Sequence, residues 1–262
     1  MTNALTTSAT GMVAQQMNLE VISNNLSNVN TTGFKSQRAE FQDLMYQTMS
    51  GSGSQTGANS SLPITVQIGL GSKFSANSTN FSQGALQQTG NPTDVAVNGA
   101  GFFRIQKPDS TFAYTRDGSF KTDGTGQLVT SDGYPLDPAI SIPKGASALT
   151  ISGDGAVSAI AAGSNDPQKL GDIKLYMFTN TGGLTRIGQN LYTAGGASGD
   201  AQEVTPGLEG SGTLSSAFIE GSNVAVVEEM VRMISTQRAY EINSKAIQTA
   251  DDMLGTVNNL KR

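Results

Sequence analysis

The last forty residues, from Asn223 to Arg262, read NVAVVEEMVRMISTQRAYEINSKAIQTADDMLGTVNNLKR, and they determine how the rest of the chain is organised. The stretch contains no proline, and its one glycine is Gly255. A row of small or apolar side chains recurs every seven residues, with two more placed between its members: Ala239, Ala246, Met253 and Leu260, then Ala250 and Val257. A repeat of this period is typical of a helix that packs against another helix. The stretch therefore predicts one long helix with an apolar seam.

Other side chains widen this seam or extend it toward the start of the helix: Val227, Met230, Val231, Ile234, Ile242, Ile247 and Leu254. Glu228 and Glu229 lie near the start, where carboxylates complement the positive end of the helix dipole. Asn223 is the expected helix cap because Ala225 has no side chain that can cap. Two interpretations of Arg238 and Tyr240 stay open, namely a specific contact between subunits or ordinary surface packing with Arg238 paired to a carboxylate.

The first 32 residues supply the expected partner helix. Its seam has the same period and comprises Leu5, Met12, Leu19 and Leu26, with Ala9, Ile22 and Val29 between or beside them. Because the segment is rich in Thr, Ser and Asn, it should be a marginal helix by itself. The helix either docks once onto its own domain or is surrounded by other subunits, which its nearly uncharged surface permits. Gly33 is the expected left-handed cap at its end.

Composition excludes several classes of function. The 262 residues include no cysteine and no histidine, so no Ser-His-Asp or Cys-His arrangement can form, and zinc would have to rely on carboxylates. Charged residues make up 14% of the chain, and the formal net charge of −5 argues against nucleic acid as a partner. No apolar run is long enough for a membrane span, and the start MTNALTTSAT does not resemble a cleavable secretion signal. We expect no catalytic, cofactor or metal site.

The middle of the chain alternates with period two and predicts short antiparallel strands. The candidates are Ile64 to Leu70, Val95 to Val97, Phe102 to Ile105, Phe112 to Tyr114, Leu128 to Val129, Ala148 to Ile151, Ile173 to Phe178, Leu184 to Ile187, Leu191 to Thr193 and Leu214 to Ile219. Asp117, Asp123, Asp132 and Asp154 each precede a glycine, and turn formation explains them better than catalysis or calcium binding. Residues 36–50 suit a short helix or an extended arm, and 50–61 have the composition of a flexible linker.

The predicted fold class is α+β, with long N- and C-terminal helices that pair in the manner of a coiled coil and a central antiparallel all-β domain. We expect a discontinuous helical domain of residues 1–34 and 223–262. Residues 35–72 and 207–222 would form a connector, and residues 73–206 an outer β domain.

Two longer motifs carry a resemblance to a known family. Residues 23–35, SNNLSNVNTTGFK, closely resemble the N-terminal motif of bacterial flagellar rod and hook proteins, and residues 233–245, MISTQRAYEINSK, resemble the closing motif of the same family. Shorter likenesses occur at residues 115–120 and 190–193. The resemblance implies a structural subunit whose terminal helices build a tubular polymer, with these interface residues: Leu5, Met12, Leu19, Ile22, Asn25, Leu26, Val29, Gly33, Phe34, Ile234, Arg238, Ala239, Tyr240, Ile242, Ala246, Ile247, Met253, Leu254 and Val257.

The resemblance also implies partners and a location. The partners would be further copies of the chain, proximal rod and hook proteins, the peptidoglycan and outer-membrane ring proteins, and the flagellar type III export apparatus. The chain would lie in the flagellar basal body, exported without a cleaved signal. The stretch from Met49 to Gln67 and the modest length favour the distal rod member of the family over hook. The alternatives are a proximal rod protein, a secreted β-domain enzyme acting on cell-wall glycan, and a binding module whose ends pair within one monomer.

Overall fold

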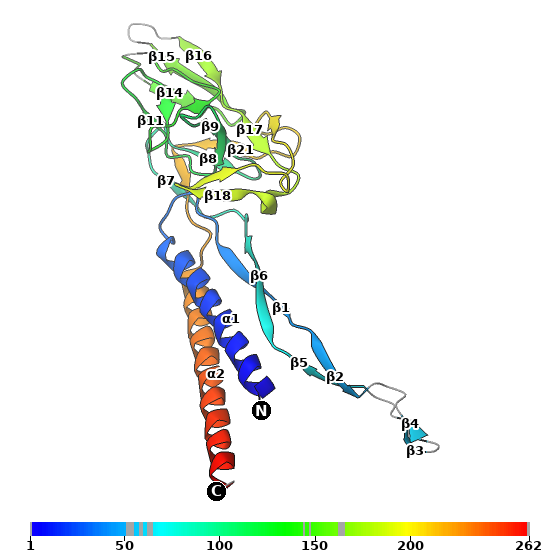
Figure 1. Cartoon of the computed structure of the whole chain (residues 1–262). Helices are drawn as coiled ribbons and strands as arrows, with labels where there is room; N and C mark the ends of the chain where they lie inside the picture. Colours follow the sequence, from blue (N-terminus) through cyan, green and yellow to red (C-terminus); the bar gives the residue numbers. More distant parts are fainter. Residues whose placement is uncertain are drawn as a thin grey trace. The chain divides into compact units, whose positions relative to one another are not determined.

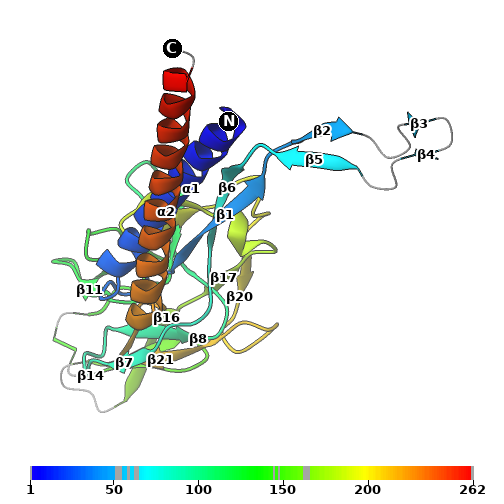
Figure 2. The same ribbon diagram turned by 90° about the horizontal axis from the view of Figure 1, so that it is seen from below.

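The computed structural model describes residues 2–50, 55–57, 60–61, 65–143, 145–146, 148–161 and 166–260. The chain divides into two compact units (Figures 1 and 2). The helical unit comprises Met1–Leu26, Gln37–Ser78 and Ala225–Arg262, and the β unit comprises Ser27–Ser36 and Thr79–Val224. Both predicted helices and the predicted central antiparallel β region are present, which confirms the α+β class.

The helical unit contains two helices and a long β ribbon. Helix α1 spans Thr2–Ser27, and helix α2 spans Val226–Leu260. At 1.5 Å per residue, α2 is about 52 Å long. The helices run antiparallel, since side chains near the end of α1 contact the start of α2.

The ribbon resolves the alternatives for residues 36–50 in favour of an extended arm. Strand β1 (Gln37–Asp43) pairs with β6 (Ser72–Thr79), and β2 (Tyr46–Ser50) pairs with β5 (Val66–Gly69). Two short strands, β3 (Gln55–Gly57) and β4 (Ser60–Ser61), pair farther along. The expected strand at 64–70 is therefore confirmed over 66–69, while Ile64 and parts of the 49–67 stretch lie outside the described residues.

The β unit consists of short antiparallel strands. Its largest sheet has the order β13-β9-β10-β19-β18, from Leu136–Asp137, Phe103–Gln106, Phe112–Thr115, Leu191–Thr193 and Thr185–Gly188. A second sheet joins β14 (Ala148–Ile151), β15 (Ala156–Ile160) and β16 (Pro167–Asp172). The remaining pairs are β8 (Val95–Asn98) with β21 (Thr213–Ser216), β7 (Leu86–Gln88) with β22 (Phe218–Glu220), β11 (Lys121–Thr122) with β12 (Leu128–Val129), and β17 (Leu175–Met177) with β20 (Gln202–Val204). A 3-10 turn, η1, covers Thr181–Gly183.

Three clusters of buried side chains hold the β unit together, of which the smallest contains Ile105, Ala113 and Leu191. One is mainly aliphatic and includes Val95, Val97 and Leu175, and it also takes in the edge-to-face pair Phe103 and Phe120. Another is aromatic and consists mainly of Phe102, Tyr114, Tyr176, Phe178 and Tyr192. Such edge-to-face packing orients rings as well as burying them.

The Asp-Gly pairs form turns, but not all in the same way. Gly133 has a φ of +85°, as a tight turn after Asp132 requires. The Asp123 carboxylate instead accepts hydrogen bonds from the Thr125 and Gln127 backbone N–H groups. Gly118 is needed because a Cβ there would lie 1.7 Å from the Val95 carbonyl oxygen. The hydrogen bonds to Asp123 satisfy that carboxylate within its own turn.

The structure groups some residues differently from the expected three-part division. Residues 37–78 belong to the helical unit, whereas 207–222 belong to the β unit. The reason is pairing: β21 and β22 hydrogen-bond to β8 and β7, so the last strands complete the β unit before α2 begins.

Candidate assembly surface

Helices α1 and α2 meet through a polar seam with a seven-residue repeat in each helix. The Asn25 side chain donates to Glu229, and Asn18 donates to the Thr236 hydroxyl at 2.9 Å. Seven residues earlier in α1, a Cβ on Gly11 would lie 3.0 Å from the Asn243 amide. The expected coiled-coil-like period is therefore present, but its contact positions carry small or polar residues. A polar seam position fixes the register of a helix pair at a cost in stability.

Most of the apolar row expected to form this seam lies elsewhere on α2. Ala246 is exposed, and Met253 and Val257 are each half exposed, whereas Ile247, Leu254 and Ala250 are partly or fully buried. In α1, the row of Leu5, Met12, Leu19 and Leu26 is half-buried, one position from the Gly11–Asn18–Asn25 line. The spacing is as expected, and Ala250, which is buried, continues the Glu229–Thr236–Asn243 line seven residues on, whereas Ala246 and Met253 of the expected row are exposed.

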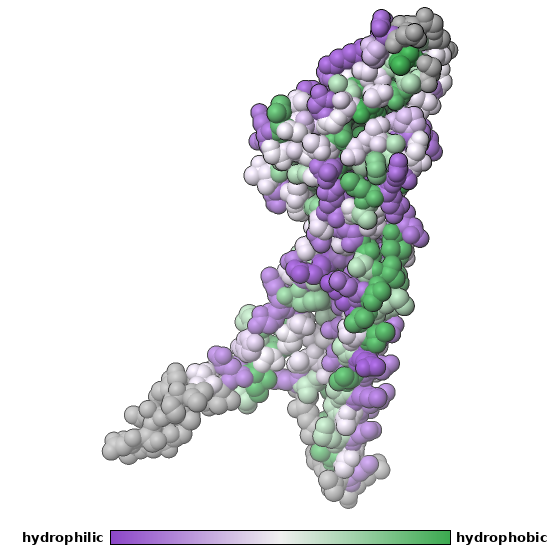
Figure 3. Space-filling model, turned by 180° about the vertical axis from the view of Figure 1, so that it is seen from behind, coloured by the Kyte–Doolittle hydropathy of each residue, from purple (hydrophilic) through white to green (hydrophobic). Residues whose placement is uncertain are grey.

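A second row of α2 is apolar and exposed. Val227, Met230, Val231 and Ile234 follow the i, i+3, i+4, i+7 pattern of one helix face, with Val227 75% and Val231 61% exposed. Because Val227 and Ile234 are each two residues, about 200°, from Glu229 and Thr236, this stripe faces away from α1. Figure 3 shows it as a green area on the first turns of α2, and the helix is more polar farther along. We call these four residues the α2 stripe.

The other predicted residues of α2 fall around the stripe. Ile242 and Tyr240 are exposed, and Ala239 is half-buried. Arg238 is exposed and makes no ion pair with any residue that the structure describes, so the interpretation that pairs it with a carboxylate of the same chain finds no support there.

Three predicted interface residues make their contacts within a single subunit. The buried Asn25 amide accepts a hydrogen bond from the Gln37 N–H at 2.9 Å and donates to the Gln37 carbonyl at 2.8 Å. Gly33 has a φ of +65°, and a Cβ there would lie 2.6 Å from the Asp117 backbone nitrogen. Phe34 is buried beneath the Arg186 guanidinium. We therefore assign these residues to the fold of a single copy and not to its outer surface.

We expect replacement of Asn25 by alanine to lower the free energy of unfolding of the helical unit by about 1–3 kcal/mol, because the partly buried Gln37 peptide groups and the buried Glu229 side chain would lose a partner. Urea denaturation followed by helical circular dichroism measures this. The control is Asn30→Ala, which changes an exposed asparagine near the same end of α1. Equal effects of the two substitutions would contradict the role assigned to Asn25.

The two expected helix caps are both replaced by other arrangements. Helix α1 ends at Ser27, so the left-handed Gly33 belongs to the turn beyond it. Helix α2 begins at Val226, and the Ala225 carbonyl accepts the Glu229 N–H at 3.0 Å. The Asn223 side chain instead accepts the Ser36 N–H at 2.7 Å and donates to the Asn80 and Ser82 carbonyls. Asn223 thus ties three crossing segments of the β unit together.

A buried charge cluster lies beside this crossing. The Glu220 carboxylate is 2.6 Å from the Lys35 ammonium and 3.2 Å from the Arg116 guanidinium, and the Lys35 and Glu220 side chains are both 0% exposed. Lys35 also donates to the Ser82 carbonyl, and the Gly84 N–H donates to Glu220. Burial lowers the pKa of Lys35, an effect that the hydrogen bond and charge of Glu220 oppose. We call Lys35, Arg116 and Glu220 the charge cluster.

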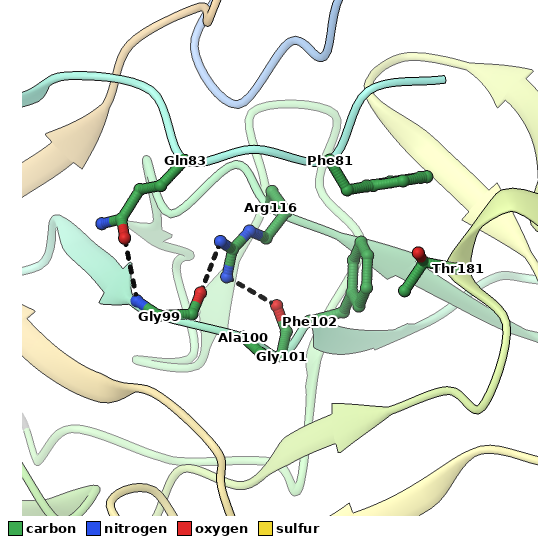
Figure 4. Close-up of a pocket in the computed structure, with 8 residues that line it drawn as sticks. All are labelled: Phe81, Gln83, Gly99, Ala100, Gly101, Phe102, Arg116 and Thr181. Atoms are coloured by element: carbon green, nitrogen blue, oxygen red, sulfur yellow. Dashed lines mark hydrogen bonds between the residues drawn. The ribbon is translucent and has the colours of Figure 1, made fainter. Parts of the chain in front are cut away.

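A pocket of about 360 Å³ lies next to the charge cluster in the β unit (Figure 4). Phe81 and Gln83 form one wall, and Gly99 to Phe102 form the other. Arg116 is the one charged side chain among the described lining residues, and it donates to the Gly99 and Gly101 carbonyls at 2.7 Å. Its guanidinium is thus engaged with the wall and with Glu220, which gives it a structural part in the pocket.

Among the described residues, neither helix is apolar enough over a sufficient length to cross a bilayer. The described residues also contain no group of three or more His, Cys, Asp or Glu side chains that could hold a metal ion.

Comparison with known proteins identifies three family segments. Residues 5–35 match the model "Flagella basal body rod protein", 96–159 match "Flagellar hook protein FlgE/F/G D1 domain", and 215–260 match "Flagellar basal body rod FlgEFG protein C-terminal". The flagellar basal-body rod protein FlgG of Borreliella burgdorferi is 52% identical over the full length of both chains. Two proteins of Caulobacter vibrioides are similar to this chain to different degrees. The flagellar basal-body rod protein FlgG of this bacterium is 47% identical over 98% of this chain and 99% of its own length. The flagellar basal-body rod protein FlgF is 32% identical over 98% of this chain and 100% of its own length.

Proposed function

The chain belongs to the family of flagellar basal-body rod proteins, and from this premise we propose that it is a structural subunit of the distal rod, which polymerises into a tube and transmits motor torque to the hook. The role proposed is mechanical and not catalytic. One observation carries it, namely the exposed α2 stripe on a helix whose opposite face is already occupied by α1. An apolar helix face of this kind is stable in water only when another surface covers it.

The location of the stripe supports an open polymer. A surface on one side of a subunit that meets a different surface of the next subunit generates a ring or an open helical filament. The polar seam between α1 and α2 does not bury the stripe. A subunit whose two helices are paired therefore still has an exposed apolar face. The polymer, and not the subunit alone, would bury the large apolar side chains of α2.

The choice of distal over proximal rod rests on the comparisons. Against two proteins of one bacterium, identity is 47% to FlgG and 32% to FlgF over nearly the same length. The resemblance of the stretch from Met49 to Gln67 to the distal rod member of the family supports the same choice. The proposed partners are further copies, the proximal rod, the hook, the peptidoglycan and outer-membrane rings and the type III export apparatus.

Electron microscopy of isolated basal bodies tests this function directly. The gene would be deleted in the source bacterium and replaced by a version encoding a labelled full chain. We expect the label on the rod segment next to the hook, and a rod without hook in the deletion strain. Label on the lower rod would support the proximal alternative. Basal bodies without label, in cells that make the protein and swim, would overturn the proposal.

We also expect limited proteolysis to distinguish free from assembled subunits. Because most large apolar side chains of α2 are exposed in a single copy, we expect residues 2–27 and 226–260 to be digested at least tenfold faster in dilute subunit than in polymer, while the β unit stays intact in both. Mass spectrometry of the fragments over time measures this. Termini equally resistant in both states would instead support a self-contained module whose ends pair within one monomer.

A further inference from the structure

The helical unit contains an apolar groove between α1 and the β1–β6 ribbon. Its volume is about 340 Å³, and its lining includes Ala9 and Val13 from α1 with Leu44, Lys73 and Phe74 from the ribbon. Both walls belong to one compact unit, so the groove is a feature of that unit by itself. An apolar groove of this size is large enough to receive several side chains.

The walls of the groove are exposed. Val13 is 55% exposed, and Phe74 and the nearby Met17 and Phe41 are also partly open to solvent. Phe41 contacts Phe74 edge to face, with ring centroids 6.1 Å apart, which fixes the orientation of the aromatic wall. The groove thus presents a fixed apolar surface that no described residue of the same chain fills.

We propose that this groove receives the α2 stripe of a second copy of the chain. The inference rests on the proposed function, since it names the surface to which that stripe binds in the polymer. The stripe of the same copy is held away from the groove, because α2 is fixed against α1 through Thr236 and Glu229, and the stripe lies on the opposite face. Its occupant must therefore come from another molecule.

Size and charge both fit this occupant. The four stripe residues span about 10 Å of helix and present only aliphatic or thioether side chains, which match the Val13, Leu44 and Phe74 lining. Lys73 on the groove makes no ion pair within the described chain, and Glu228 beside the stripe is 71% exposed, 3.8 Å from Arg232. A Lys73–Glu228 pair between copies would set the direction in which the stripe enters the groove. Charge pairs of this type act mainly on specificity and association rate.

The two surfaces also give a mode of growth. Each copy has one stripe and one groove on different elements, so each can bind one neighbour through the stripe and another through the groove. A contact of this head-to-tail kind leaves a free groove at one end of the polymer and a free stripe at the other, so it can propagate.

Cysteine cross-linking in the full chain tests the docking, because the natural sequence has no cysteine. The test variant carries Val231→Cys and Val13→Cys. After polymerisation and mild oxidation, we expect denaturing electrophoresis without reductant to show a ladder of covalent multimers, at least tenfold above either single variant. The matched control pairs Val13→Cys with Ile242→Cys, a side chain 66% exposed on a different face of α2, and should give no ladder.

Each outcome has a separate meaning. Polymer without a ladder from the test variant would overturn the docking inference while leaving the proposed function in place. A ladder from the Ile242 control instead would show that another row of α2 docks, which also overturns it. Failure of the unmodified chain to polymerise under any condition would contradict the proposed function and, with it, this inference.

Charge reversal provides an independent measurement on the same contact. Lys73→Glu and Glu228→Lys should each raise the concentration needed for polymerisation by about threefold, as expected for an exposed ion pair. The double variant should restore the original value within error. A double variant as weak as the sum of the two single changes would show that these residues do not meet.

Discussion

Replacement of Glu220 by alanine is expected to lower the free energy of unfolding of the β unit by about 3–5 kcal/mol, because removal of one partner leaves buried charges uncompensated. Lys35 and Arg116 would lose the one carboxylate that contacts both of them in the described structure. The Gly84 N–H would also lose its acceptor. Urea denaturation followed by a β-sheet signal measures the change.

Two control variants distinguish the effect of the lost charge on stability from a general disturbance of the fold. Asp200→Ala removes an exposed carboxylate of the same unit and should change stability by less than about 0.5 kcal/mol. Glu220→Gln keeps the shape and removes the charge, so a loss close to that of Glu220→Ala would assign the effect to electrostatics. Glu220 raises the pKa of Lys35 against the lowering by burial, so its removal should lower that pKa further. The buried Lys35 of the variant then loses its proton at a lower pH than in the unmodified chain, and the deficit should shrink as the pH rises. A loss below about 1 kcal/mol at neutral pH would refute the account of the charge cluster.

Introduction of a charge into the α2 stripe is expected to abolish assembly. With Val231→Glu, polymer formation would require burial of an unpaired carboxylate, at a cost of several kcal/mol. A penalty of about 3 kcal/mol corresponds to a rise of roughly a hundredfold in the concentration needed for polymerisation. Sedimentation of the purified full chain and swimming of complemented cells measure the effect.

The matched control is Gln248→Glu, at an exposed position on the same helix below the stripe. It adds the same charge and should leave both assembly and swimming unchanged. Circular dichroism should show that both variants keep their β unit. Normal assembly of a folded Val231→Glu variant would show that the stripe is not buried in the polymer, and the proposed function would then lose the observation that carries it.

Local patterns were enough to predict both helices and many of the strands, but they left residues 36–50 undecided and did not indicate β6, β15 or β16. The period-two segments around Phe103, Phe112, Leu128 and Leu191 became β9, β10, β12 and β19, because strands in a small antiparallel unit bury alternate side chains. The unbroken pattern after Asn223 became α2. In each case the information is contained within a few neighbouring residues.

The face of each helix that contacts the other helix could not be predicted in this way. A hydrophobic repeat shows which side chains must be buried, but it does not show which partner buries them. In this chain the positions that face α1 are Glu229, Thr236 and Asn243, which hydrophobicity alone places on a solvent face. Their contacts with Asn25 and Asn18 depend on pairs more than 200 residues apart in sequence.

The charge cluster was missed for a related reason. Lys35 is the last residue of the N-terminal motif, but no spacing connects it to Glu220, which follows 185 residues later. A lysine that directly follows a buried aromatic residue is a weak signal of burial. The stronger signal, a carboxylate at the end of the last strand before α2, has meaning only once β22 is known to pair with β7.

The crossing of segments in the β unit has a consequence for how a copy joins the polymer. The Gly33 N–H donates to the Glu220 carbonyl at 2.8 Å, and Asn223 binds Ser36 at 2.7 Å, so the segments that lead to α1 and α2 leave the β unit from one shared point. Tethering of this kind raises the effective concentration of one helix around the other into the millimolar range. Their encounter is then independent of how much protein is present, and even a weak, polar contact is sufficient to bring them together. Each arriving molecule thus delivers two helices in a single association step, and the translational entropy lost on elongation is that of one body and not two.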